Sequence, residues 1–309
     1  MLTTLRARHA SLLPLVFACL VLLLLPVASH ATTAPDLRGR IVIDGYTSDW
    51  SPDENVFGDN GTQYSQEPTN DSRWGQYNDL SGFRVTWDRR ALYVAAEGVI
   101  WDNNMVLLID ILPGEGFADM SLLDTWRRII SFSPGFAPDL FLATWDGNAW
   151  PRLLRHIVGN QMNDQPPGVD FEAVSTFSQG NSGRAMEARI PWSQIVRFRA
   201  PGWVRDTVIA GQPDTLSLLP PGSSVRLAQV LTAGTDGSGG PDVAPNNSNG
   251  CSDYAGVPII EDNFAIIPLD VDNDGLPDLG ASPLSRVTFN VAVLPVRRSS
   301  WGALKTSGR

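Results

Sequence analysis

Short stretches of alternating apolar and polar residues run along this chain, and Gly, Pro, Asn and Asp separate them. Alternation with period two places one face of a β-strand in a core and the other in solvent. In the stretch 83–87, for example, Arg84 and Thr86 alternate with aromatic and aliphatic residues. The pattern predicts strands at 40–43, 83–87, 92–99, 105–111, 129–132, 140–145, 185–190, 225–231, 264–268 and 287–294.

Many short strands in a chain of this size are typical of an all-β domain, namely a two-sheet antiparallel β-sandwich with long loops. The stretch 105–111 is apolar on both faces, so we expect it to be a central strand. Short helices are predicted at 121–127 and after Pro191. The polar stretches 47–78, 160–183 and 232–253 are predicted loops.

The N-terminal segment 1–31 has the three parts of a secretory signal peptide. Arg6 and Arg8 precede an apolar run, and Ser29 and Ala31 give a small-x-small pattern at its end. The run is shorter than the ~20 residues of a membrane span, although an uncleaved anchor helix is the alternative. We therefore expect cleavage after Ala31 and a secreted, extracellular or periplasmic protein, with one domain at 32–296 and a short basic tail at 297–309.

Charge and cysteine content limit the partners, disulfides and metal sites that we expect. The signal holds two of the 23 basic residues and none of the 33 acidic ones, which leaves a net charge of −12. This balance argues against nucleic acid or an anionic membrane as a partner. Cleavage leaves Cys251 as the sole thiol and His156 as the sole imidazole, so we expect no internal disulfide and no multi-histidine metal site.

The sharpest motif is the acidic stretch 270–278. Asp270, Asp272 and Asp274 occupy positions 1, 3 and 5 of a DxDxDG pattern, the carbonyl of Leu276 follows, and Asp278 stands at position 9. Carboxylate and carbonyl oxygens are the ligands that calcium prefers. Position 12 is an alanine and no helical pattern flanks the stretch, so it differs from a full EF-hand. The motif predicts a structural calcium site, and the alternative is a solvated acidic turn.

Tryptophans beside polar residues are the second signal. The apolar faces of sugar rings stack on aromatic side chains, while sugar hydroxyls pair with Asp, Asn and Arg. We expect the tryptophans at 50, 87 and 192 to be core residues. Trp150, like the candidates named next, lies beside polar residues and could form part of a sugar-binding surface. The predicted carbohydrate-binding residues are Trp101, Trp126, Arg127, Trp145, Asp146 and Asn148.

Several short motifs, taken in order, resemble family 9 carbohydrate-binding modules and the wider DOMON-like β-sandwich group. They are Ile43-Asp-Gly, Asp49-Trp, 85–88 with 92–95, 106–110, Glu187-Ala-Arg-Ile-Pro-Trp, and the Gly-rich loop 234–245, which is similar to one related to the C-terminal domain of glucodextranase. The resemblance covers about 37–294. It implies a jelly-roll-like sandwich, calcium as a structural ion and sugar binding through aromatic residues, without assigning a binding site.

The sequence thus favours a secreted, calcium-stabilised β-sandwich that binds a polysaccharide or oligosaccharide without catalysis. A structural or adhesion component of the cell envelope, within a surface assembly, is the alternative. A glycoside hydrolase or lyase is a third reading, which would need a cleft with two facing carboxylates. The sequence contains no G-x-S-x-G nucleophile motif.

Overall fold

A computed structural model describes eleven stretches of the chain, all within one compact unit that spans 34–309. At 145, 204–209 and 212–215 it describes the backbone alone. The predicted signal 1–31 and tail 297–309 lie outside the described residues. The described residues are 36–57, 67–68, 70–112, 114–145, 150–168, 171–176, 185–196, 204–209, 212–247, 258–278 and 287–290.

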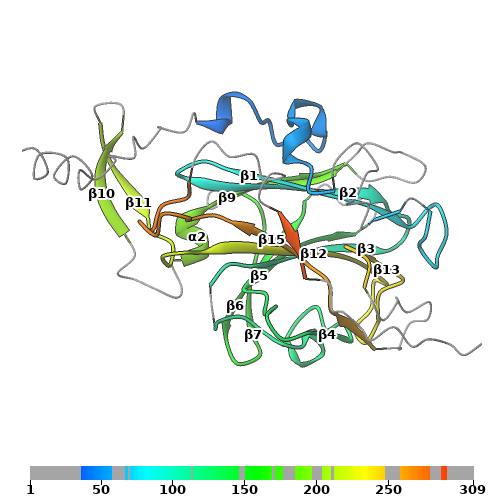
Figure 1. Cartoon of the computed structure of the whole chain (residues 1–309). Coiled ribbons are helices and arrows are strands. Elements are labelled where there is room, and N and C mark those ends of the chain that lie inside the picture. Colours follow the sequence, from blue (N-terminus) through cyan, green and yellow to red (C-terminus); the bar gives the residue numbers. More distant parts are fainter. Residues whose placement is uncertain are drawn as a thin grey trace, which may run out of the picture. The chain divides into compact units, whose positions relative to one another are not determined.

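The smaller of the two main sheets is antiparallel and has the strand order β1-β2-β9-β8 (Figure 1). The long pair β1 and β2 forms its edge, and the register shifts between Leu80 and Gly82 in β1. The strands are β1 (Asp79–Trp87), β2 (Ala91–Val99), β8 (Glu172–Ser175) and β9 (Ala185–Pro191).

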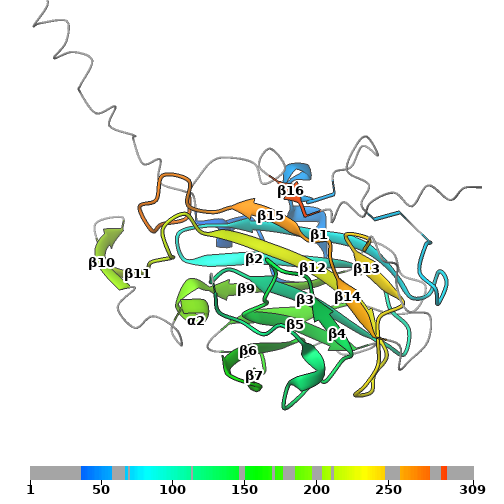
Figure 2. The ribbon, with the colours of Figure 1, turned by 60° about the horizontal axis from the view of Figure 1, so that its bottom comes forward.

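The larger sheet is also antiparallel, with the order β16-β15-β12-β3-β5-β6-β7, and β13 pairs with β12 on the edge opposite β3, where β15 also pairs (Figure 2). Its strands are β3 (Asn104–Asp110), β5 (Leu140–Trp145), β6 (Arg152–Val158), β7 (Gln161–Gln165), β12 (Ser224–Thr232), β13 (Asp242–Ala244), β15 (Ala265–Pro268) and β16 (Thr288–Phe289). The prediction of an all-β, two-sheet antiparallel sandwich is confirmed.

Strand β3 is central and buried on both faces, as its apolar pattern predicted. Met105, Leu107 and Ile109 belong to the core cluster shared with the smaller sheet. Val106 and Leu108 lie in a second cluster on the opposite face of the larger sheet. That second cluster includes Phe117, Met120, Leu123, Ile130 and Phe136, from the segment between β3 and β5. The sandwich therefore has an extra layer of irregular chain over the larger sheet.

Part of that extra layer is a small parallel pair, β4 (Ile130–Phe132) with β14 (Ile259–Glu261). A hairpin of β10 (Val204–Ile209) and β11 (Gln212–Ser217) forms a further two-stranded sheet. Within the stretches that the structure describes, no helix is long and apolar enough to cross a membrane.

Two predicted elements are wrong. The stretch 40–43 is not a strand, because the chain there runs between the short 3₁₀ turns η1 (Leu37–Gly39) and η2 (Thr47–Asp49), with η3 (Pro52–Glu54) following. The helix predicted at 121–127 is only the 3₁₀ turn η4 (Met120–Leu122), since Leu123 is already extended with ψ of 155° and Trp126 has a left-handed φ of +54°.

The helix predicted after Pro191 is confirmed as α2 (Trp192–Val196). The predicted loop 160–183, in contrast, contains β7 and β8. Strand β7 lies at the edge of the larger sheet, and only Met162 of its five residues is buried. An exposed edge strand needs few apolar side chains, which is why its polar sequence looked like a loop.

Candidate functional site

Three strands of the larger sheet end together and place the predicted aromatic candidates in one neighbourhood. Asn104 begins β3, and it pairs with Trp145 at the end of β5 and with Thr232 at the end of β12. The loops that continue from these ends are 100–103 and 233–241, and the segment 124–129 lies beside them through the bridge of Arg128 to Ser238. Residues distant in sequence therefore converge at this end of the sheet.

A cleft of about 550 Å³ opens at this end of the sheet. Its volume lies within the ~300–1,000 Å³ range of ligand pockets in proteins. The lining combines one aromatic ring with carboxylate, amide, hydroxyl and guanidinium groups. These come from Asp102, Asn104, Thr125, Trp126, Arg128 and Asp236.

Trp126 provides the aromatic wall of the cleft. Its ring is half-buried, contacts the edge of Phe141 at 6.3 Å between centroids, and lies 5.3 Å from the guanidinium carbon of Arg128. A tryptophan with a left-handed backbone is an outlier that the surrounding structure must hold in place. The surrounding structure therefore holds this ring between the core and the cleft.

Arg128 is the buried cation of the cleft, with only 3% of its surface exposed. Its Nε donates to Oγ1 of Thr232 at 3.0 Å, and its Nη1 lies 3.4 Å from Oδ1 of Asp236. The amide orientation of Asn104 that satisfies both of its polar atoms places its oxygen 2.8 Å from Nη2. Burial lowers the pKa of Arg128, and the Asp236 charge opposes that shift.

Asp236 joins the two arginines at the rim. It accepts from the backbone N of Arg127 at 3.1 Å and from Nε and Nη2 of the same residue at 3.1 and 3.0 Å. The backbone carbonyl of Arg127 in turn accepts from Gly237 N at 2.7 Å. Arg127, a predicted sugar ligand, thus fastens the Gly-rich loop to the cleft and does not line it.

Trp101 stands at the neighbouring loop with 48% of its surface exposed. Its ring meets the half-exposed Tyr77 edge to face at 6.1 Å, and Asn78 holds the loop by accepting from Trp101 N and from Asn103 Nδ2. Its neighbour Asp102, with φ of +56°, lines the cleft. The loop therefore exposes an aromatic side chain next to a cleft residue.

The remaining predicted aromatic residues divide by location. The side chain of Trp145 and the residues Asp146 and Asn148 lie outside what the structure describes. Trp150 is 64% exposed but lines a different hollow, with Phe171 and Arg189. The tryptophans at 50, 87 and 192 are buried core residues, as predicted.

Sequence reasoning missed five residues of this cleft: Asp102, Asn104, Thr125, Arg128 and Asp236. Most of them adjoin the aromatic candidates in the sequence, so proximity was a usable signal. What the sequence could not provide was the return of the loop after β12 to the segment around Trp126, which brings Asp236 to both arginines.

The acidic stretch 270–278 closes into a compact loop. Oxygens of Asp270, Asp272 and Asp278 all lie within 4.8 Å of one another. Asp270 is buried and its Oδ2 accepts from Gly275 N at 2.9 Å, where φ of +81° makes the predicted glycine turn. The predicted convergence of carboxylates is thus present for these three residues.

Asp274, another predicted ligand of the loop, lies differently. It is not one of the three converging carboxylates, and its Oδ1 accepts from Leu276 N at 2.8 Å in a local turn. Asp278 also accepts from Val271 N, which ties the two ends of the loop together. Three hard oxygen donors fit calcium, and the ion would supply the neutralising charge that three adjacent carboxylates need.

Three of the motifs behind the proposed family resemblance meet in one buried network. Glu187 of β9 accepts from the indole N of Trp50 at 2.6 Å and from the backbone N of Gly45 and Asp44 at 2.6 and 3.0 Å. Burial raises the pKa of Glu187 to about 7. The network fixes the N-terminal turns against the smaller sheet and is structural.

No protein-family model matches this chain, and no curated protein matches it. The resemblance to family 9 carbohydrate-binding modules therefore stays a prediction from the motifs, and the function below is argued from the site.

Proposed function

We propose that this protein is a secreted, non-catalytic carbohydrate-binding β-sandwich, with the sugar in the cleft at the ends of β3, β5 and β12. The observation that carries the proposal is the ring of Trp126 beside a set of hydrogen-bonding groups in one cleft. Stacking on the ring and hydrogen bonding to hydroxyls are the two interactions that a sugar needs. The exposed Trp101 extends the aromatic surface beyond the cleft.

Binding fits the lining of the cleft better than hydrolysis does. A glycosidase places two carboxyl groups on opposite sides of the scissile bond, one of which donates a proton. Among the described residues, the carboxylates that line this cleft are those of Asp102 and Asp236. Both oxygens of Asp236 are already engaged by Arg127 and Arg128, so this residue is a structural acceptor.

The test is a glycan array with the purified mature protein, followed by titration of the strongest glycan against variants. Trp126→Ala should weaken binding by about fivefold to tenfold, because a lost stacking contact is worth ~1–1.5 kcal/mol and 1.4 kcal/mol is a factor of ten. Trp101→Ala tests the exposed ring without touching the core.

Trp150→Ala is the matched control, since this side chain is also exposed but lines another hollow, and it should bind as the parent does. No signal from any glycan with the folded protein would contradict the proposal and favour a scaffold or adhesion role. Equal affinity of the Trp126→Ala, Trp101→Ala and Trp150→Ala variants would place the sugar elsewhere.

We also propose that calcium occupies the 270–278 loop as a structural ion. The loop abuts the end of the sandwich through two contacts, since the indole N of Trp87 donates to the Asp278 carbonyl at 2.9 Å and Leu219 N donates to the Gly275 carbonyl at 2.8 Å. An ion held there would stabilise the folded state by mass action.

A further inference from the structure

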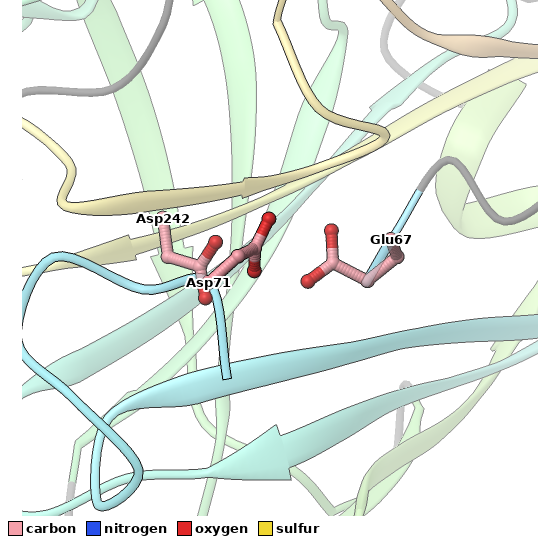
Figure 3. Close-up of side chains that lie close together, drawn as sticks. All are labelled: Glu67, Asp71 and Asp242. Atoms are coloured by element: carbon pink, nitrogen blue, oxygen red, sulfur yellow. The ribbon is translucent and has the colours of Figure 1, made fainter. Parts of the chain in front are cut away.

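A second group of carboxylates lies far from the 270–278 loop in sequence. Glu67 and Asp71 precede β1, and Asp242 begins β13. One oxygen from each lies within 4.8 Å of the others. Figure 3 shows the Glu67 carboxylate directed toward those of Asp71 and Asp242.

Glu67 is the unusual member of this group. Only 8% of its surface is exposed, and both of its carboxylate oxygens are buried without any hydrogen-bond partner. A buried carboxylate without a partner costs several kcal/mol or more, and even a neutral buried acceptor without a partner costs ~1–3 kcal/mol. A side chain held this way needs a partner, and the described residues do not provide one.

The other two carboxylates are fixed in place by neutral donors. Asp242 is 1% exposed and its Oδ2 accepts from Leu80 N of β1 at 2.8 Å. Asp71 is exposed to solvent and its Oδ2 accepts from Nδ2 of Asn246 at 2.6 Å. Both side chains are thus oriented before any ligand arrives, which reduces the entropy lost on binding.

The charge around Glu67 is strongly negative. Burial, together with the carboxylates of Asp242, Asp71, Asp79 and Glu261 in that order, raises the pKa of Glu67 to about 11. Burial likewise raises the pKa of Asp242 to about 8. Asp79 and Glu261 are themselves buried. A bound cation would relieve this repulsion and hold the carboxylates ionised.

We propose that Glu67, Asp71 and Asp242 form a second calcium site, separate from the 270–278 loop. The donors are all carboxylate oxygens, which are hard ligands. Calcium fits better than magnesium, because calcium accepts irregular oxygen sets whereas magnesium demands a near-ideal octahedron and keeps several waters. The solvent-exposed Asp71 gives the ion a path of entry.

The position of the site gives the ion a structural task. Asp242 stands on β13 of the larger sheet and bonds to Leu80 in β1 of the smaller sheet, while Glu67 and Asp71 belong to the segment that leads into β1. Calcium there ties that segment to both sheets. Asp242 also belongs to the stretch 234–245 that carries Asp236, so the site anchors the C-terminal part of that stretch.

Calcium stoichiometry and affinity test the site, measured by titration calorimetry on EDTA-stripped, desalted full-length mature protein. All variants carry Asp272→Asn, which removes one carboxylate charge from the 270–278 loop and so weakens that site relative to the second one. The single Asp272→Asn protein should still bind one calcium ion. Adding Glu67→Gln, which preserves shape, should abolish that binding, and adding Asp71→Asn should weaken it at least tenfold.

Glu172→Gln is the matched control, since this carboxylate is exposed on β8, and it should keep the calcium ion. In EDTA, Glu67→Gln should melt at the parent temperature or higher, because the amide keeps the shape of the carboxyl group and cannot carry a buried charge. Calcium binding unchanged by Glu67→Gln and Asp71→Asn, or no binding in the Asp272→Asn parent, would overturn the proposal. If Glu67→Gln does not fold, the exposed Asp71→Asn variant decides by the same criteria.

Discussion

Replacing Asp236 by alanine should destabilise the fold more than the exposure of this side chain suggests. Its pair with Arg127 is open to solvent on both sides, with side chains 56% and 49% exposed, so that pair alone is worth ~0–1 kcal/mol. Arg128, however, is 3% exposed and would keep Thr232 and the Asn104 amide as partners while losing its counter-charge. A buried charged donor that loses a partner costs ~1–3 kcal/mol. We therefore expect a loss of about 2 kcal/mol.

Urea unfolding followed by tryptophan fluorescence measures this loss as a shift in midpoint at constant slope. The matched control is Asp164→Ala, because Asp164 pairs with Arg152 at 2.7 Å and both side chains are about one-third exposed. The control should lose at most ~1 kcal/mol, and that loss should fade at high salt as screening weakens an exposed pair. The same loss for both variants would refute the role of Asp236 as the counter-charge of the buried Arg128, and with it the description of the cleft that rests on this pair.

Three further predictions test other parts of the structure. EDTA should lower the melting temperature of the parent by several degrees, and Asp272→Asn should shrink that shift; an ion at 100 times its dissociation constant contributes ~2.7 kcal/mol. Glu187→Gln should cost ~1–3 kcal/mol at pH 8 in chemical denaturation, because its amide would face the indole N–H donor, and a neutral effect would contradict the network. Gly82→Ala should lower the melting temperature more than Gly75→Ala. Both glycines have positive φ, but a Cβ at Gly82 would lie 2.5 Å from the Phe57 ring. Equal effects of the two variants would show that this contact relaxes freely.

The strands of the sandwich could be predicted where burial alone sets the pattern. The stretch 105–111 is apolar throughout because β3 lies in the middle of the larger sheet and has a hydrophobic cluster on each face. Strand β7 escaped prediction because an edge strand keeps polar side chains on its solvent face. The stretch 40–43 was wrongly predicted to be a strand. Ile41 is buried as a strand residue would be, but its backbone hydrogen-bonds within a turn.

The candidate site was predictable in its aromatic residues and not in their partners. Trp101 and Trp126 stood out because polar residues flank them, and the structure places them at neighbouring loops. The tie between Arg128 and Asp236 spans more than 100 residues of sequence, and no local pattern reveals such a pair. Glu67 could not be recognised from the sequence for the same reason, because its environment depends on Asp242 of β13, which lies far from it along the chain.

The central claim is that sugar stacks on the aromatic wall of this cleft, and the indole N–H resonances of the tryptophans test it most directly. The protein is labelled with ¹⁵N, titrated with the strongest glycan from the array, and its indole signals are assigned by Trp→Phe variants. We predict saturable shifts for Trp126 and Trp101, with the buried Trp192 and the exposed Trp150 unchanged. Shifts confined to Trp150, or no shift at any indole with a glycan that binds, would contradict the claim.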